Sequence, residues 1–240
     1  MIVKHSLAYL TFFCLSVAAH AQQKEATTPV QFRAVLHDPM HPTAELYYTD
    51  YKGAVTKLEF RPHDLTATLF ALPVNGVLVF YDKAEVDPKK PEASLAASAK
   101  LPPELKRAIV VVLPAPAGTK PAYRLVLIDD SLKAFPRGES RVLPLVKVET
   151  AIQAGEHRMP VHPGKITSVP PVKKVNEFNM AQTNFYYQQG QSWVPFTERQ
   201  LQFLEAYRRV FIIHATPGAL QPTVTTIVDT ATIAPVAPPK

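Results

Sequence analysis

Two dense apolar runs in the middle of the chain constrain its fold more than any other feature. Ala108 to Leu113 (AIVVVL) and Tyr123 to Ile128 (YRLVLI) are short, contain several β-branched residues and are bounded by turn residues. Such runs are typical of buried β-strands rather than helices. A fainter copy follows in Glu205 to Pro217 and Pro222 to Asp229, about a hundred residues later. The sequence therefore indicates a β-rich protein in which one unit recurs.

The recurrence has a fixed offset of 101 residues, the difference between Glu104 and Glu205. Other matches fall at the same offset: Arg107 with Arg208, Pro116 with Pro217, Pro121 with Pro222, and Leu58 to Thr66 with Met159 to Thr167. A unit of about 100 residues is the usual size of an immunoglobulin-like sandwich. We expect an all-β chain of two tandem immunoglobulin-like β-sandwich domains. The alternative is one larger sandwich whose strands resemble one another.

Turn residues and alternating apolar positions locate the other expected elements. Proline is frequent (24 residues) and glycine is scarce (8 residues), which is consistent with a loop-rich all-β chain. Strands are expected from Val30 to Leu36 and, later, from Val172 to Phe178, with a surface loop from Lys83 to Lys100. Thr197-Glu-Arg-Gln200 has the form of a helix capping box, so a short helix is allowed near 198–208.

The N-terminus has the pattern of a secretory signal peptide. Lys4 precedes an apolar run too short to span a bilayer, and Ala19-His20-Ala21 is a small-x-small cleavage signal. The expected organisation is a signal peptide (1–21), a leader (22–29), two sandwich domains (30–130 and 131–232) and a disordered tail (233–240). The only cysteine, Cys14, lies in the signal, so the mature protein would have neither disulfides nor a thiol nucleophile. We expect a bacterial periplasmic or secreted protein without a transmembrane segment in its mature chain.

The formal net charge of +6 is spread along the chain in isolated pairs such as Lys89-Lys90 and Lys173-Lys174. A nucleic-acid-binding domain usually concentrates its basic residues in a patch or stripe. We therefore expect no nucleic-acid partner, and a mildly basic surface that aids solubility or attraction to an anionic envelope.

A turn-rich segment joins the two proposed domains. It is Phe135-Pro-Arg-Gly-Glu-Ser-Arg-Val-Leu143, and a His162-Pro-Gly164 turn follows it. With the signal peptide and the β-rich halves, this order of features resembles a group of uncharacterised exported proteins of verrucomicrobial-type bacteria. The resemblance covers most of the mature chain and implies a β-sandwich fold, with no activity or catalytic residue to transfer.

Histidine and methionine come together twice and raise the question of a copper site. The candidate ligands are His37, Met40 and His41 in the first half, and His157, Met159 and His162 in the second. Imidazole suits Cu(II) and thioether suits Cu(I). The alternative is that the histidines belong to proline-rich turns and that Met159 is a core residue. Neither cluster has the fixed spacing of a closed metal site, so no cofactor is expected.

Catalytic motifs are weak. Asp38, Asp64 and Asp129-Asp130 are acidic residues that a hydrolase could pair, and His63 is next to Asp64. The chain has no Gly-x-Ser-x-Gly elbow, no His-Glu-x-x-His and no phosphate-binding glycine loop. Asp129-Asp130 falls at the proposed domain junction, where solvated turn carboxylates are the simpler interpretation. We expect no catalytic residues and no enzyme.

Aromatic side chains are the better candidates for a binding surface. They are Tyr48 in the first half and Tyr186, Tyr187 and Trp193 in the second, beside a glutamine-rich loop. Such rings stack on sugars or on partner proteins, although core packing is their more common role. We therefore expect an exported non-catalytic scaffold, accessory subunit or protein-interaction module, with another envelope protein as partner. A carbohydrate-binding protein is the alternative, and a periplasmic copper protein the second alternative.

Overall fold

The computed structural model describes residues 28–38, 44–216 and 218–230, and these residues form an all-β protein. They make four sheets of four strands each, which confirms the predicted all-β sandwich class. Sheet I is β4-β1-β7-β8 and sheet II is β3-β2-β5-β6, while sheet III is β12-β9-β15-β16 and sheet IV is β11-β10-β13-β14. In the first half the strands are β1 (Val30–Leu36), β2 (Tyr47–Thr49), β3 (Val55–Lys57), β4 (Leu69–Ala71), β5 (Val77–Tyr81), β6 (Leu95–Lys100), β7 (Arg107–Pro114) and β8 (Tyr123–Asp129). In the second half they are β9 (Ser140–Pro144), β10 (Thr150–Ala154), β11 (His157–Val161), β12 (Thr167–Val169), β13 (Met180–Gln189), β14 (Ser192–Gln202), β15 (Arg208–His214) and β16 (Thr223–Asp229).

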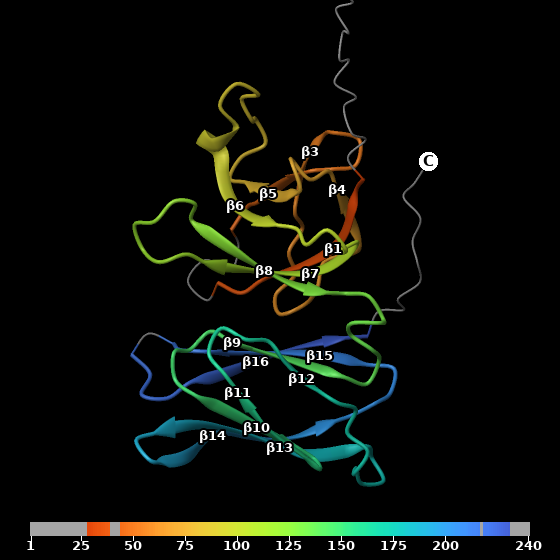
Figure 1. The fold of residues 1–240 in the computed structure, drawn as a ribbon, viewed down its shortest axis with the longest axis vertical. Coiled ribbons are helices and arrows are strands. Elements are labelled where there is room, and N and C mark those ends of the chain that lie inside the picture. Colours follow the sequence, from red (N-terminus) through yellow and green to blue (C-terminus); the bar gives the residue numbers. More distant parts are fainter. Residues whose placement is uncertain (1–27, 39–43, 217, 231–240) are drawn as a thin grey trace, which may run out of the picture.

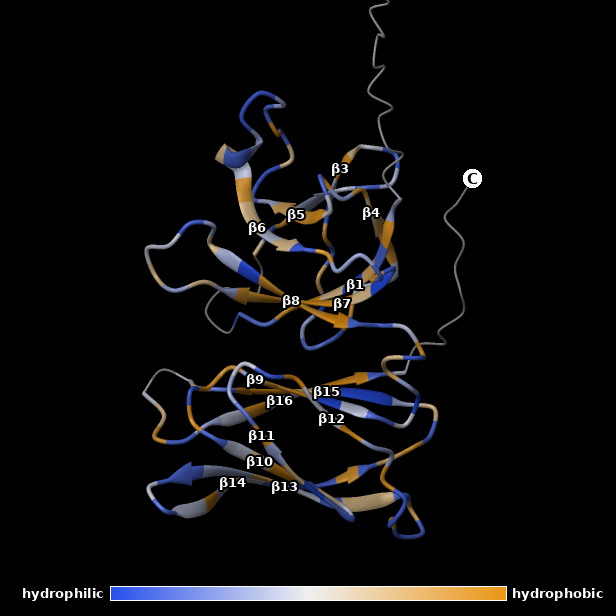
Figure 2. Ribbon diagram, in the orientation of Figure 1, coloured by the Kyte–Doolittle hydropathy of each residue, from blue (hydrophilic) through white to orange (hydrophobic). Residues whose placement is uncertain are grey.

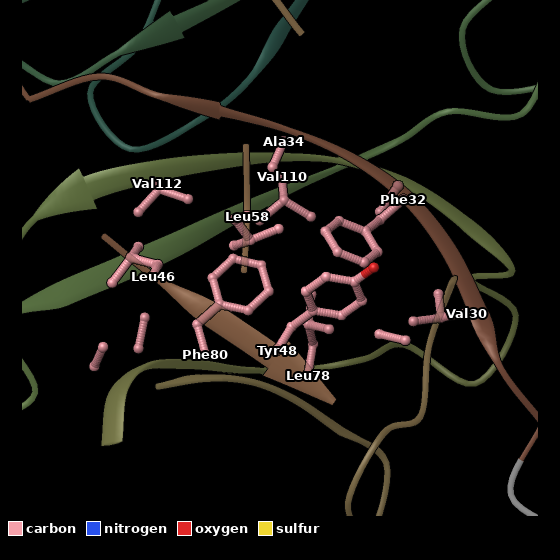
Figure 3. Packing of buried hydrophobic residues seen from close by; sticks show 14 residues of the cluster. Val30, Phe32, Ala34, Leu46, Tyr48, Leu58, Leu78, Phe80, Val110 and Val112 are labelled. Atoms are coloured by element: carbon pink, nitrogen blue, oxygen red, sulfur yellow. The ribbon is translucent and has the colours of Figure 1, made fainter. Parts of the chain in front are cut away.

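The sheets are stacked as four layers in the order II, I, III, IV (Figure 1). Sheets I and II enclose the first core, in which Phe32, Tyr48 and Phe80 pack together (Figure 3). Sheets III and IV enclose a second core around Phe185 and Phe211, whose ring centroids are 5.2 Å apart. A third cluster of buried apolar residues lies between sheets I and III and joins the two halves.

The position of β7 and β15 in the inner sheets explains why their sequences are almost continuously apolar. In β7, Ala108, Val110 and Val112 face the first core, and Ile109, Val111 and Leu113 face the cluster between the halves. In β15, Phe211 and Ile213 face the second core while Val210 and Ile212 face the same central cluster. A strand covered on both sides needs apolar residues at every position rather than at alternate ones. Figure 2 shows the result as orange strands in the middle of the molecule.

The two halves have the same strand order when β9 to β16 are matched with β1 to β8. Both also contain a parallel pair at the centre of the inner sheet, β1 with β7 and β9 with β15. An immunoglobulin constant domain instead places its first, second, fifth and fourth strands in one sheet and its third, sixth and seventh in the other. Each half is therefore a sandwich of two sheets, as an immunoglobulin domain is, but the order of its strands differs from the immunoglobulin order.

The segment between the halves is held by a stacked aromatic ring. Phe135 is fully buried, and the guanidinium carbons of Arg141 and Arg208 each lie 4.4 Å from its ring centroid. Gly138 has a φ of +78° and donates its backbone N–H to Tyr207 O at 2.9 Å. The segment from Phe135 to Leu143 is therefore a structural connection, in which the phenylalanine and two arginines fix the path of the chain.

Several local expectations are wrong. The helix near 198–208 is not formed. Residues up to Gln202 belong to β14, which pairs with β13 except at a bulge at Phe196, and β15 begins at Arg208. The ten residue pairs between β13 and β14 stabilise the strand more than the capping pattern, which is a weak local preference, stabilises a helix. The expected loop from Lys83 to Lys100 ends in β6, and no strand forms from Val172 to Phe178. The expected signal peptide and C-terminal tail lie outside the described residues.

Candidate functional site

The outer face of sheet IV is the broadest surface that gathers the predicted aromatic residues. Thr183 and Phe185 of β13 point into the core, so the alternate residues Asn184 and Tyr186 point outward. Directly paired residues of neighbouring strands share a face of a sheet. From the register, the outer face comprises Arg158 and Pro160 of β11, Ala151 and Gln153 of β10, Gln182, Asn184, Tyr186 and Gln188 of β13, and Trp193, Pro195, Glu198 and Gln200 of β14.

A chain of side-chain hydrogen bonds orders the middle of this face. Gln182 Nε2 donates to Asn184 Oδ1 at 2.6 Å, and Asn184 Nδ2 donates to the Tyr186 hydroxyl at 3.2 Å. That hydroxyl donates in turn to Gln153 Oε1 at 3.3 Å. The Arg158 guanidinium lies 5.8 Å from the Tyr186 ring centroid, within the range of a cation–π contact. The amide groups and the tyrosine are thereby held in defined orientations.

Trp193 is the exposed ring of this face. It pairs with Gln188, and its side chain lies diagonally from Tyr186, which pairs with Pro195. The residue is 44% exposed, and in the described part of the chain its indole has no ring partner. An indole left open beside ordered amides is available to stack on a ligand.

The other two predicted aromatic residues are not on this face. Tyr187 points to the opposite side of β13 and packs edge-on against Phe196, with ring centroids 6.0 Å apart. Tyr48 lies in the core of the first half, 4% exposed and 5.2 Å from the Phe32 ring, so it cannot contact an external ligand. The sequence could not separate these cases, because neighbouring residues of a strand point to opposite faces.

Among the described residues, His157 and His162 of the second predicted copper cluster have separate partners. His157 Nε2 lies 3.1 Å from Pro171 O, whereas His162 Nδ1 lies 2.8 Å from Glu149 Oε2. Met159 packs against the second core. Met40 and His41 lie outside the described residues. Among residues 28–38, 44–216 and 218–230, no group of three or more His, Cys, Asp or Glu side chains is arranged to hold a metal ion.

A pocket of about 360 Å³ lies at the junction of the halves. His37 at the end of β1 and His214 at the end of β15 meet there, with ring centroids 4.5 Å apart, and His63 lies on the pocket wall. His214 Nε2 is 3.0 Å from Thr225 Oγ1. Burial, followed by the nearby His214 and His63, lowers the pKa of His37 to about 4, against the weaker opposing charge of Asp38. Burial also lowers the pKa of His214.

The lowered pKa of His37 predicts acid destabilisation. Between pH 6.5 and about 4, His37 is protonated in the unfolded chain but stays neutral in the folded protein. Because the unfolded state binds more protons, the free energy of unfolding falls as the pH drops through this range. We expect a loss of about 1–2 kcal/mol over this window, since the partly exposed ring is screened by solvent. Urea unfolding at several pH values measures it. His37→Gln should flatten the profile, whereas the exposed His162→Gln should not, and an unchanged profile in H37Q would contradict the assignment.

A buried ion cluster lies between the inner sheets. Arg33 of β1 binds Asp229 (Nη1–Oδ1 2.7 Å) and Asp130 (Nη2–Oδ1 2.8 Å), and Arg208 of β15 binds the same two carboxylates. All four residues are at most 4% exposed. Burial acts to raise the pKa of Asp229, but the hydrogen bonds and charges of Arg33 and Arg208 outweigh it and lower the pKa to about 2.

The cluster corrects the expectation of solvated carboxylates at the junction. Only Asp129 is exposed, while Asp130 is buried and also lies 3.7 Å from Arg107. Carboxylates that are ionised and saturated by arginines are poor general acids or bases. The sequence did contain one indication of this cluster, the repetition of Arg107 as Arg208 at the offset of 101. Each of these arginines begins a strand and lies beside an aspartate at the end of the following strand, Asp130 for Arg107 and Asp229 for Arg208.

Comparisons with known proteins provide no relative. No family model matches the chain, and no curated protein sequence is similar to it. Among the described residues, no helix has the length and apolar character needed to cross a membrane. The functional assignment therefore depends on the geometry of the surfaces described above.

Proposed function

We propose that the protein is an exported, non-catalytic recognition protein of the bacterial cell envelope, and that the outer face of sheet IV is its binding surface. The observation that supports this most directly is the open Trp193 indole beside a hydrogen-bonded row of amides and Tyr186. The inner sheets are used to join the two halves, so their faces are not free to bind a partner. The export of the chain and its place among exported verrucomicrobial-type proteins are part of this proposal.

The opposite end of the molecule has a more ordinary surface. On sheet II, Lys57 Nζ lies 2.5 Å from Glu45 Oε1, and both side chains are exposed. Such a pair is typical of a solvated sheet and contributes little to stability or recognition. We further propose that the two halves are tandem repeats of one β-sandwich unit, since they share one strand order, and that this unit is immunoglobulin-like in its two layers but not in its strand order.

A photo-crosslinking residue in place of Gln200, on the outer face of sheet IV, should capture a macromolecule in the native envelope. The matched control carries the same residue at the exposed Lys57 of sheet II. We expect a discrete high-mass adduct from position 200, lost when Trp193→Ala is combined with it, and none from position 57. Equal or absent adducts at both positions would show that this face is not the recognition surface.

A further inference from the structure

We infer that the outer face of sheet IV binds an extended, uncharged polysaccharide, with Trp193 as the stacking platform. This inference rests on the proposed function and names the class of ligand that the face recognises. It follows from three properties of the described residues: the chemistry of the side chains, their charge and their spacing.

The side chains match the two surfaces of a sugar ring. A pyranose presents C–H groups on its faces and hydroxyls around its rim, so it pairs with an aromatic ring and with groups that both donate and accept hydrogen bonds. Trp193 supplies a large open ring. The amides of Gln153, Gln182, Asn184 and Gln188 each combine two N–H donors with a carbonyl acceptor, as a sugar hydroxyl requires.

The charge of the face argues for an uncharged ligand. Arg158 and Glu198 carry opposite charges on it. Glu149 lies next to Gln188, and its Oε2 is 2.8 Å from His162 Nδ1, so charges of both signs are spread over the face. An acidic polymer would be attracted by a patch of one sign, which this face lacks. A protein partner is also less well matched, because the centre of a protein interface is usually apolar and fully desolvated. Here the centre is a row of amides.

The spacing suits a chain that lies along β13 and β14. Alternate residues on a strand are about 6.6–6.8 Å apart, and diagonal neighbours on paired strands are about 7–8 Å apart. Trp193 and Tyr186 are such diagonal neighbours, and Asn184 and Gln182 continue the row from Tyr186. A chain of hydrogen bonds already links Gln182 through Asn184 and Tyr186 to Gln153 and holds these side chains in place. Ligand binding would therefore immobilise few additional side chains.

Affinity gel electrophoresis of the purified mature chain tests this inference. The gels contain hydroxyethyl cellulose, xyloglucan or dextran as neutral polymers, and polygalacturonate as a charged one. We expect at least one neutral polymer to retard the wild-type protein, and Trp193→Ala to weaken that binding by about tenfold or more. Phe178→Ala is the matched control, since Phe178 is another exposed aromatic residue (66%) in the turn before β13. It should bind as the wild type does.

Fluorescence supplies an independent readout, because Trp193 is the only tryptophan of the chain. Its emission should shift to the blue, and its quenching by acrylamide should decrease, when the retarding polymer is added. Tyr186→Phe retains this reporter and should bind more weakly through loss of the hydroxyl in the amide chain. Circular dichroism of each variant establishes that it is folded.

Two results would overturn the inference. One is the absence of retardation by all three neutral polymers, and the other is equal retardation of the wild type and Trp193→Ala. If the photo-crosslinker at position 200 still captured a protein in a Trp193-dependent manner, the recognition surface would stand and only the ligand class would be wrong. If position 200 captured nothing, the proposed function itself would fail.

Discussion

Replacement of Arg208 by methionine is expected to lower the free energy of unfolding by about 3–5 kcal/mol. The substitution keeps an unbranched side chain but leaves Arg33 as the one arginine that binds both buried carboxylates, with Arg107 3.7 Å from Asp130. Arg208 also donates Nη1–H to Phe135 O at 2.9 Å, which would lose this donor. The cost of the substitution is the cost of two buried carboxylates that each lose one of their arginine partners.

Urea denaturation followed by circular dichroism measures this effect at neutral pH. Lys57→Ala is the control, because it removes an exposed ion pair and should change stability by about 1 kcal/mol or less. Because the cluster joins the halves, Trp193 fluorescence and circular dichroism should report one common transition in the wild type. If the urea midpoint of Arg208→Met differed from that of the wild type no more than the midpoint of Lys57→Ala does, a structural role for the cluster would be contradicted.

Replacement of Phe135 by alanine should destabilise the protein by about 3–5 kcal/mol. The ring is fully buried, it belongs to the cluster between the halves, and its centroid lies 4.4 Å from the guanidinium carbons of both Arg141 and Arg208. Its removal would leave a cavity and take away the aromatic face against which both guanidinium groups pack. The loss therefore combines packing with electrostatics.

Phe135→Leu separates these two contributions, since it retains most of the volume and loses only the aromatic face. We expect it to cost less than the alanine variant, with a remainder of about 1–2 kcal/mol per desolvated cation–π contact. Thermal unfolding of both variants beside Phe178→Ala, whose ring is exposed, provides the comparison. If Phe135→Ala unfolded at the same temperature as Phe178→Ala, the ring could not be the element that fixes the connection.

The sequence was a good guide where strands are buried on both faces. Ala108 to Leu113 and Val210 to Ile213 are apolar at every position because each lies between two cores, and the recurrence at an offset of 101 residues corresponds to one strand order used twice. The sequence misled at Thr197 to Gln200, where a local capping pattern lies in a long paired strand. Hairpin pairing is a property of two segments, so one segment alone could not reveal it.

The candidate site was predictable only in part, for a similar reason. The aromatic residues could be identified in the sequence. Which of them point outward could not, because Tyr186 lies outside and Tyr187 packs against Phe196 only once it is known which alternate residues of β13 face the core. The amides that accompany Trp193 come from two strands, β10 and β13, and only the register shows that Gln153, Asn184 and Tyr186 share one surface. The partners of Asp130 were equally hidden, because Arg33 and Arg208 are 97 and 78 residues away in sequence.

The continuous stack of layers also sets a distance. Packed sheets lie about 10 Å apart, so the three gaps between four layers place the backbones of the two outermost sheets about 30 Å from each other. Apolar packing and the buried ion cluster join the two halves at the middle gap, so a change of this separation would have to disrupt both. A ligand held on sheet IV and anything attached to the far side of sheet II would therefore be separated by the full thickness of the four layers.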